Sequence, residues 1–230
     1  MEYLQILGII FEFLTTVAGF VSTYLILKRN PEYIGNRMMA TSTTFMGLYT
    51  LFILFYDLVS EVWAIQVFLR AAMISILFVG VFVFYTIQIL VFSSKNLMKK
   101  RNWVPFLVAS LVYSVYLILE QNFITIHSID PVNVSISMLP LLILIAQLLF
   151  YVLFSLFFLV KNGIMQTTGQ TKKKITIYTL GLSLTLIAIV LNIISQLVAP
   201  DVGEVLDVVY FAIIWLSVTI MSIGFLLKQE

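Results

Sequence analysis

The chain has 230 residues, of which 61% are hydrophobic and only 10% are charged, and its mean hydropathy is +1.08. Soluble domains average about 25% charged residues, so this composition excludes a water-soluble globular protein and predicts an integral membrane protein. The net charge is only +2, and the absence of cysteine excludes a disulfide, a thiolate nucleophile and a cysteine metal site.

Seven apolar stretches are candidates for transmembrane helices, because a helix that crosses a bilayer needs roughly 20 apolar residues. The stretches lack the two-residue alternation of barrel strands, so helices are predicted rather than strands. In chain order they are Leu4–Leu27, Met38–Val59, Val62–Phe92, Trp103–Leu119, Met138–Val160, Ile175–Val198 and Val208–Leu227. The sequence therefore predicts an all-α membrane protein, a seven-transmembrane helix bundle formed by a single domain, residues 1–230.

The first and third spans each carry a charged residue within the apolar stretch. In the first span, one helical face carries Gln5, Glu12, Thr16, Gly19 and Thr23, and this face is expected to point inward. In the third span, Arg70 lies one turn after Gln66 on the same face. At 1.5 Å per residue, Glu12 and Arg70 each lie roughly 13 Å from the same membrane surface. Because charges inside a membrane usually pair, we expect Glu12 to be the partner of Arg70, with Asp57 and Asp207 as alternatives.

The loops between the spans alternate in the sign of their charge. Twelve of the thirteen Lys and Arg residues fall on one side, in "KRNPEYIGNR", "SSKNLMKKRN", "KNGIMQTTGQTKKK" and the C-terminal end, whereas the other side carries acids only. The positive-inside rule then places the N-terminus outside and the C-terminus in the cytoplasm. Topology and contacts with anionic lipid headgroups explain these basic runs, so no nucleic-acid partner is expected.

The loop "FITIHSIDPVNVSIS", Phe123 to Ser137, joins the fourth and fifth spans on the outer side. Its apolar residues alternate on both sides of an Asp-Pro pair, which predicts a small β-hairpin that covers the outer end of the bundle. An irregular loop is the alternative. The only histidine, His127, lies in this loop without nearby partners, so no metal site is expected.

Polar residues gather in the outer half of several spans, where they form the candidate ligand-binding site. The set consists of Glu12, Gln66, Arg70, Gln147, Asn192, Gln196 and Asp207. One interpretation is that these groups bind one another and hold the helices together. Another is a pocket open to the outside, with Arg70 anchoring an anionic or carbonyl-bearing ligand. A proton or ion relay is a third.

The sequence lacks the residues that define several known classes of membrane protein and enzyme. The last span has no lysine, so no retinal cofactor can be held there as a Schiff base, and no other cofactor is indicated. The third span lacks the acid–Arg–Tyr triplet of animal-type G-protein-coupled receptors, and the seventh span lacks their Asn-Pro-x-x-Tyr motif. Without a Ser-His-Asp set or a metal constellation, the chain is not expected to be an enzyme.

Two stretches, "LILKRNPEYIGNRMMATSTTFMGLYTLF" and "TTGQTKKKITIYTLGLSLTLI", resemble the N-terminal seven-transmembrane sensory region of prokaryotic histidine kinases. The resemblance implies a sensor whose N-terminus lies outside the cell. It does not imply a particular stimulus. No kinase domain follows the seventh span, so it further implies either a fragment of a longer protein or a module that signals through a separate partner.

The leading hypothesis is therefore a multi-pass sensor or receptor module of the cell membrane that binds a small ligand in an outward-facing pocket. Its expected partners are the lipid bilayer, the ligand, a cytoplasmic signalling protein such as a kinase, and a second copy in a homodimer. A small transporter or channel is the first alternative. A structural membrane subunit is the second.

Overall fold

A computed structural model describes residues 2–92, 100–129, 132–195, 198 and 200–227. Within these ranges the chain forms seven helices, one of which ends in a π-helical segment, and one pair of strands. The elements in chain order are α1 (Glu2–Arg29), α2 (Ile34–Leu58), α3 (Val62–Phe92), α5 (Lys100–Leu119), β1 (Ile124–Ile129), β2 (Val132–Ile136), α6 (Met138–Phe158), the π-helical segment η1 (Leu159–Ile164), α7 (Gly169–Ser195) and α8 (Pro200–Leu226).

Six of the helices in the described part of the chain are long and apolar enough to cross a membrane, namely all except α5. The apolar part of α5, Trp103–Leu119, is shorter. Large apolar side chains such as Phe13, Val17 and Val21 on α1 point outward and are about half exposed, as expected for a surface that faces lipid. The prediction of a mainly helical bundle is therefore confirmed, and six of its helices fit a multi-pass membrane protein by length and composition.

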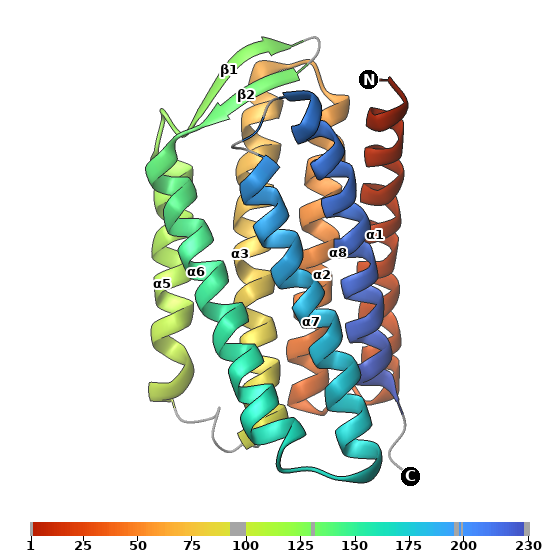
Figure 1. Cartoon of the computed structure of the whole chain (residues 1–230). Helices are drawn as coiled ribbons and strands as arrows, with labels where there is room; N and C mark the ends of the chain where they lie inside the picture. Colours follow the sequence, from red (N-terminus) through yellow and green to blue (C-terminus); the bar gives the residue numbers. More distant parts are fainter. Residues whose placement is uncertain (1, 93–99, 130–131, 196–197, 199, 228–230) are drawn as a thin grey trace.

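The helices run side by side along one axis, with α5 at one edge of the bundle (Figure 1). Helix α1 packs between α2 and α8, and α2 packs on α3. Helix α3 also contacts α5 and α6, while α7 connects α6 to α8. These contacts close a ring of six helices, and α5 lies against α3 outside that ring. Helices α1 and α3 are consequently separated by α2.

Close packing of α1 against α2 depends on glycine. A Cβ atom on Gly19 would lie 2.8 Å from both the backbone nitrogen of Gly47 and the carbonyl oxygen of Thr43. Hydroxyl pairs reinforce the same interface, because the Oγ1 atoms of Thr16 and Thr50 lie 2.8 Å apart. Small residues and interhelical hydroxyl bonds are the usual means by which membrane helices pack closely.

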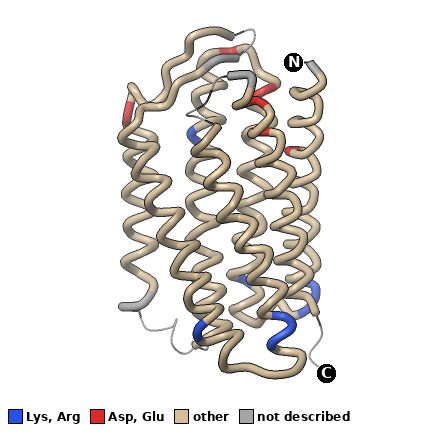
Figure 2. Tube along the Cα trace, viewed as in Figure 1, with Lys and Arg blue, Asp and Glu red and all other residues tan. Residues whose placement is uncertain are grey.

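The two ends of the bundle differ in charge (Figure 2). The acidic residues visible in this view lie toward the end that carries the hairpin and the N-terminus, and the basic residues lie at the opposite end, apart from one basic position near the acidic end. Glu32, in the turn between α1 and α2, is an acidic residue at the basic end. At the basic end Asn36 donates to the carbonyl oxygen of Asn30 at 2.8 Å, and Arg37 donates to that of Pro31 at 2.6 Å. The "NPEYIGNR" turn between α1 and α2 is thus closed by its own side chains.

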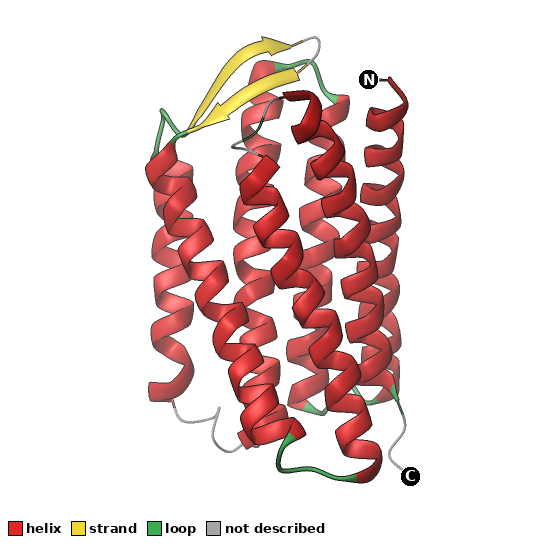
Figure 3. Cartoon of the chain, in the orientation of Figure 1, coloured by secondary structure: helices red, strands yellow, loops and turns green. Residues whose placement is uncertain are grey.

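The predicted hairpin is present (Figure 3). Strands β1 and β2 are antiparallel, with Ile124 opposite Ile136 and Ile126 opposite Val134, and the register shifts between Ile126 and Ser128. Their apolar side chains pack on the core cluster formed by α3, α5 and α6. The hairpin therefore covers that part of the bundle end. The Asp-Pro pair of the turn lies outside the described residues.

Candidate functional site

Arg70 binds the end of helix α5. Its Nε donates to the carbonyl oxygen of Leu117 at 3.1 Å, and its Nη2 donates to that of Glu120 at 3.0 Å. The last carbonyl groups of a helix lack intrahelical donors, so a cation there satisfies both their hydrogen bonding and the helix dipole. Nη1 also contacts Gln66 Oε1 at 3.4 Å, and the guanidinium lies 6.0 Å from the ring centre of Phe123.

The predicted pairing of Glu12 with Arg70 is wrong. Arg70 faces α5, whereas Glu12 lies on α1, which packs on α2 and α8. Counting residues from the membrane surface placed both charges at one depth, but depth does not specify which neighbouring helix a side chain faces. Arg70 finds its partners in backbone carbonyl groups.

Glu12 is almost fully buried, with 3% of its surface exposed, and its Oε2 has no hydrogen-bond partner among the residues that the structure describes. The side chain in hydrogen-bonding range of its carboxyl is that of Asp57, a half-buried residue near the end of α2. Two carboxyl groups from different helices therefore face each other. When both are ionised they repel, and burial makes that repulsion costly.

Asp207 on α8 adds a third carboxyl to this region. It lies beside Ser195 of α7 and acts electrostatically on Asp57. We call Glu12, Asp57 and Asp207 the acidic cluster. In the part of the chain that the structure describes, no Lys, Arg or His side chain is among the groups that act on these three carboxyls.

Two buried tyrosines lie within the acidic cluster. The hydroxyl oxygens of Tyr49 on α2 and Tyr210 on α8 are 2.8 Å apart. Glu12 and Asp207 both act electrostatically on Tyr49. The tyrosine pair, Tyr49 and Tyr210, therefore joins α2 and α8 across the interior beside the acidic cluster.

The seven predicted site residues lie in different places. Glu12 and Asp207 belong to the acidic cluster, and Gln66 and Arg70 lie together at the end of α5. Asn192 lies on α7, where its carbonyl oxygen accepts from Ser195 at 2.9 Å. Gln147 lies between α5 and α6. Gln196 lies outside the described residues.

Sequence reasoning did not include Tyr49, Tyr210 or Asp57 in the candidate set. Asp57 was only an alternative partner for Arg70. A signal was available for Tyr210, which follows Asp207 by three residues and so shares its helical face. Tyr49 lies in an apolar run without a comparable marker.

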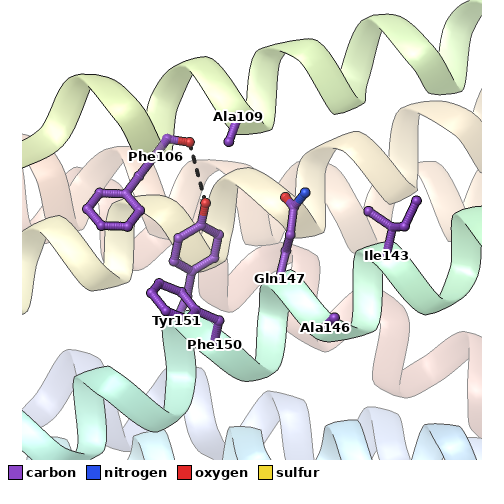
Figure 4. Close-up of a pocket in the computed structure, with 7 residues that line it drawn as sticks. All are labelled: Phe106, Ala109, Ile143, Ala146, Gln147, Phe150 and Tyr151. Carbon is purple, nitrogen blue, oxygen red and sulfur yellow. Dashed lines mark hydrogen bonds between the residues drawn. The ribbon is translucent and has the colours of Figure 1, made fainter.

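A separate recess lies between α5 and α6 (Figure 4). Its volume is about 370 Å³, and its walls are formed by Phe106, Ala109, Ile143, Ala146, Gln147, Phe150 and Tyr151. Tyr151 shares a hydrogen bond with Ser110 at 3.0 Å. The Oε1 atom of Gln147 is buried and has no hydrogen-bond partner in the described part of the chain.

The chain matches no protein-family model and no curated protein. The arguments for its function consequently come from the geometry of these sites.

Proposed function

We propose that the protein is a seven-helix sensor of the cell membrane, of prokaryotic type, and that its stimulus acts on the acidic cluster. The observation that carries the proposal is the buried carboxyl of Glu12, which faces the carboxyl of Asp57 and has an oxygen without a partner. Charged groups inside membrane bundles are costly and are usually functional.

The proposed topology has α5 as the seventh span, the N-terminus outside and the C-terminus in the cytoplasm. The segregation of basic residues at one end supports this orientation (Figure 2). The acidic cluster then lies in the outer half of the membrane. Asp57, the next-to-last residue of α2, connects it to the outer surface.

The proposed stimulus is a proton taken up from outside. Two facing carboxyls without a basic partner are relieved of their repulsion when they share a proton. Glu12 also acts electrostatically on Tyr49 of α2, and Asp207 and Tyr210 of α8 act on Asp57 and Tyr49, respectively. None of these groups is basic. Glu12 is buried, so a proton fits where a larger cation would have to displace side chains.

The signal would pass along α1 and α8 to the cytoplasmic end. Ser222 on α8 donates to Ser22 on α1 at 2.8 Å. At the end of α1, Arg29 donates to the carbonyl oxygens of Phe225 and Leu227 at 3.1 and 3.3 Å. A change in the position of α1 against α8 would therefore alter the basic end. The resemblance to sensory regions of histidine kinases makes a kinase the proposed receiver.

The proposal can be tested with Trp215, which lies on α8 with its ring centre 6.4 Å from that of Phe11, the neighbour of Glu12. In nanodiscs, a Trp63→Phe/Trp103→Phe protein should change its Trp215 emission reversibly when the pH falls. Adding Glu12→Gln should abolish that change. The control Glu61→Gln alters an exposed acid at the same end of the bundle and should leave it intact. An unchanged pH response with Glu12→Gln would refute the proposal.

A proton-coupled transporter is the second candidate, because buried carboxyls between helices also carry protons in transporters. Liposomes that contain a pH-sensitive dye distinguish the two functions. A sensor leaves the internal pH unchanged after an external acid pulse. Glu12-dependent acidification of the lumen would support the transporter instead.

A further inference from the structure

The tyrosine pair carries one hydrogen more than its own hydrogen bond uses. The hydroxyl oxygens of Tyr49 and Tyr210 lie 2.8 Å apart, and either hydroxyl can be the donor. Both side chains are buried, and among the described residues neither hydroxyl has another hydrogen-bond partner. Because each hydroxyl has a single hydrogen, the pair always has one hydrogen that points away from the bond between the two oxygens.

Two carboxyls on different helices lie beside the pair. The bond of 2.8 Å between Thr16 and Thr50 holds α1, one turn from Glu12, against the turn of α2 that contains Tyr49. Asp207 precedes the tyrosine of α8 by three residues and shares its helical face. Glu12 and Asp207 both act electrostatically on Tyr49, and Asp207 acts on the tyrosine of α8 as well. Each carboxylate therefore attracts the free hydrogen of the pair.

The other charged groups around this region are acidic. Asp57 of α2 faces Glu12, and Glu204 of α8 acts on Asp207. Within the described residues, no Lys, Arg or His acts on either tyrosine. Arg70 of α3, which packs on α2, is turned to α5, and the lysines of α7, which packs on α8, lie at the opposite, basic end. The ionisation of the carboxyls therefore decides where the free hydrogen points.

We propose that the tyrosine pair serves only one of the two carboxylates at a time, and that Tyr210 thereby raises the pH at which Glu12 takes up its proton. When Glu12 is ionised, Tyr210 donates to Tyr49, and the hydrogen of Tyr49 turns toward the Glu12 carboxylate, whose Oε2 lacks a partner among the described residues. When Glu12 is protonated, Tyr49 donates to Tyr210, whose hydrogen turns toward ionised Asp207. The inference rests on the proposed uptake of a proton by the acidic cluster.

Tyr210 is in this account a positioning residue, because it acts on Glu12 through the hydroxyl of Tyr49. A hydrogen directed at a charged acceptor is worth more than one directed at a neutral acceptor. Ionisation of Glu12 draws the pair away from Asp207, and the loss of that contact opposes the ionisation. Without the hydroxyl of Tyr210, the hydrogen of Tyr49 would be available to Glu12 at no cost to Asp207.

The test is a pH titration of the full chain in lipid nanodiscs, followed by the infrared band of the protonated carboxyl that Glu12→Gln removes. Tyr210→Phe should lower the midpoint by about half a pH unit or more, because ionised Glu12 then keeps the hydrogen of Tyr49. In a Tyr49→Phe background the same change should leave the midpoint where it is, because that hydrogen is absent. The control Tyr178→Phe removes another buried hydroxyl, which donates to Met39 Sδ at 3.4 Å, and should not shift the midpoint.

A purely structural role of Tyr210 would lower stability without making the midpoint shift depend on Tyr49. If Tyr49→Phe does not fold, Asp207→Asn provides a second background, in which the shift caused by Tyr210→Phe should shrink because the competing carboxylate is gone. An equal shift in all backgrounds, no shift, a rise of the midpoint, or the absence of a Glu12-dependent band would overturn the inference. The proposed sensor fails separately, if the carboxyl band titrates while Trp215 emission does not respond to pH.

Discussion

The side chain of Arg70 on α3 donates to the carbonyl oxygen of Leu117 on α5 at 3.1 Å, so an arginine in an apolar helix serves as the cap of its neighbour. Its second bond, to the carbonyl oxygen of Glu120, extends this contact to the segment that enters the hairpin. Helix α5 lies outside the ring of six helices, and Arg70 provides a polar attachment for its C-terminal end.

Replacement of Arg70 should therefore destabilise the attachment of α5. We expect Arg70→Leu to lower the free energy of unfolding by about 2 kcal/mol, because two carbonyl groups lose a charged donor. Arg70→Lys should recover only part of the loss, since an ammonium lacks the planar fork that reaches both oxygens. Denaturation in mixed micelles measures both values. In a double-mutant cycle, the losses of stability caused by Arg70→Leu and Glu12→Leu should be additive. A coupling energy above about 0.5 kcal/mol would instead show that Glu12 and Arg70 interact.

The tyrosine pair should couple α2 to α8. Tyr49→Phe and Tyr210→Phe each remove one hydroxyl from a buried bond of 2.8 Å. A double-mutant cycle on unfolding should give a coupling energy of about 1 kcal/mol, the net value of a neutral hydrogen bond. Purely additive losses would show that the two hydroxyls do not depend on each other.

The close contact of α1 with α2 predicts a position-specific effect of an added methyl group. Gly19→Ala should destabilise the protein by about 1–3 kcal/mol, because the new Cβ would meet backbone atoms that cannot move aside. The matched control is Gly8→Ala on the same helix. There the nearest atom to an added Cβ, on Val208, is 4.0 Å away. Equal thermal stability of the two variants would contradict the described packing.

Much of the architecture could be predicted because membrane helices are encoded by long apolar runs. The predicted third span, Val62–Phe92, has the same bounds as α3, and the alternation around the Asp-Pro pair correctly predicted the hairpin. The polar stripe of α1 was predicted correctly only in part. Glu12, Thr16 and Gly19 are buried in the interior, whereas Gln5, near the start of the helix, is exposed.

The partners of the polar residues could not be predicted in the same way. Lipid and the bundle interior are both apolar, so hydrophobic patterning does not reveal which helices are neighbours. Arg70 binds backbone carbonyl groups, which every residue carries and which leave no trace in the sequence. The contact of Glu12 with Asp57 follows from the packing of α1 on α2, and their like charges argued against placing them together.

The central claim, that Glu12 and Asp57 share a proton inside the bundle, is tested most directly by infrared spectroscopy. A protonated carboxylic acid has a carbonyl stretch that a carboxylate lacks. For the native protein in lipid nanodiscs, we predict that a fall in pH produces such a band from a carboxyl protected from water, and we predict that Glu12→Gln and Asp57→Asn each alter this band whereas Glu61→Gln does not. A native spectrum without a protonated carboxyl, or a band that persists unchanged in both cluster variants, would contradict the claim.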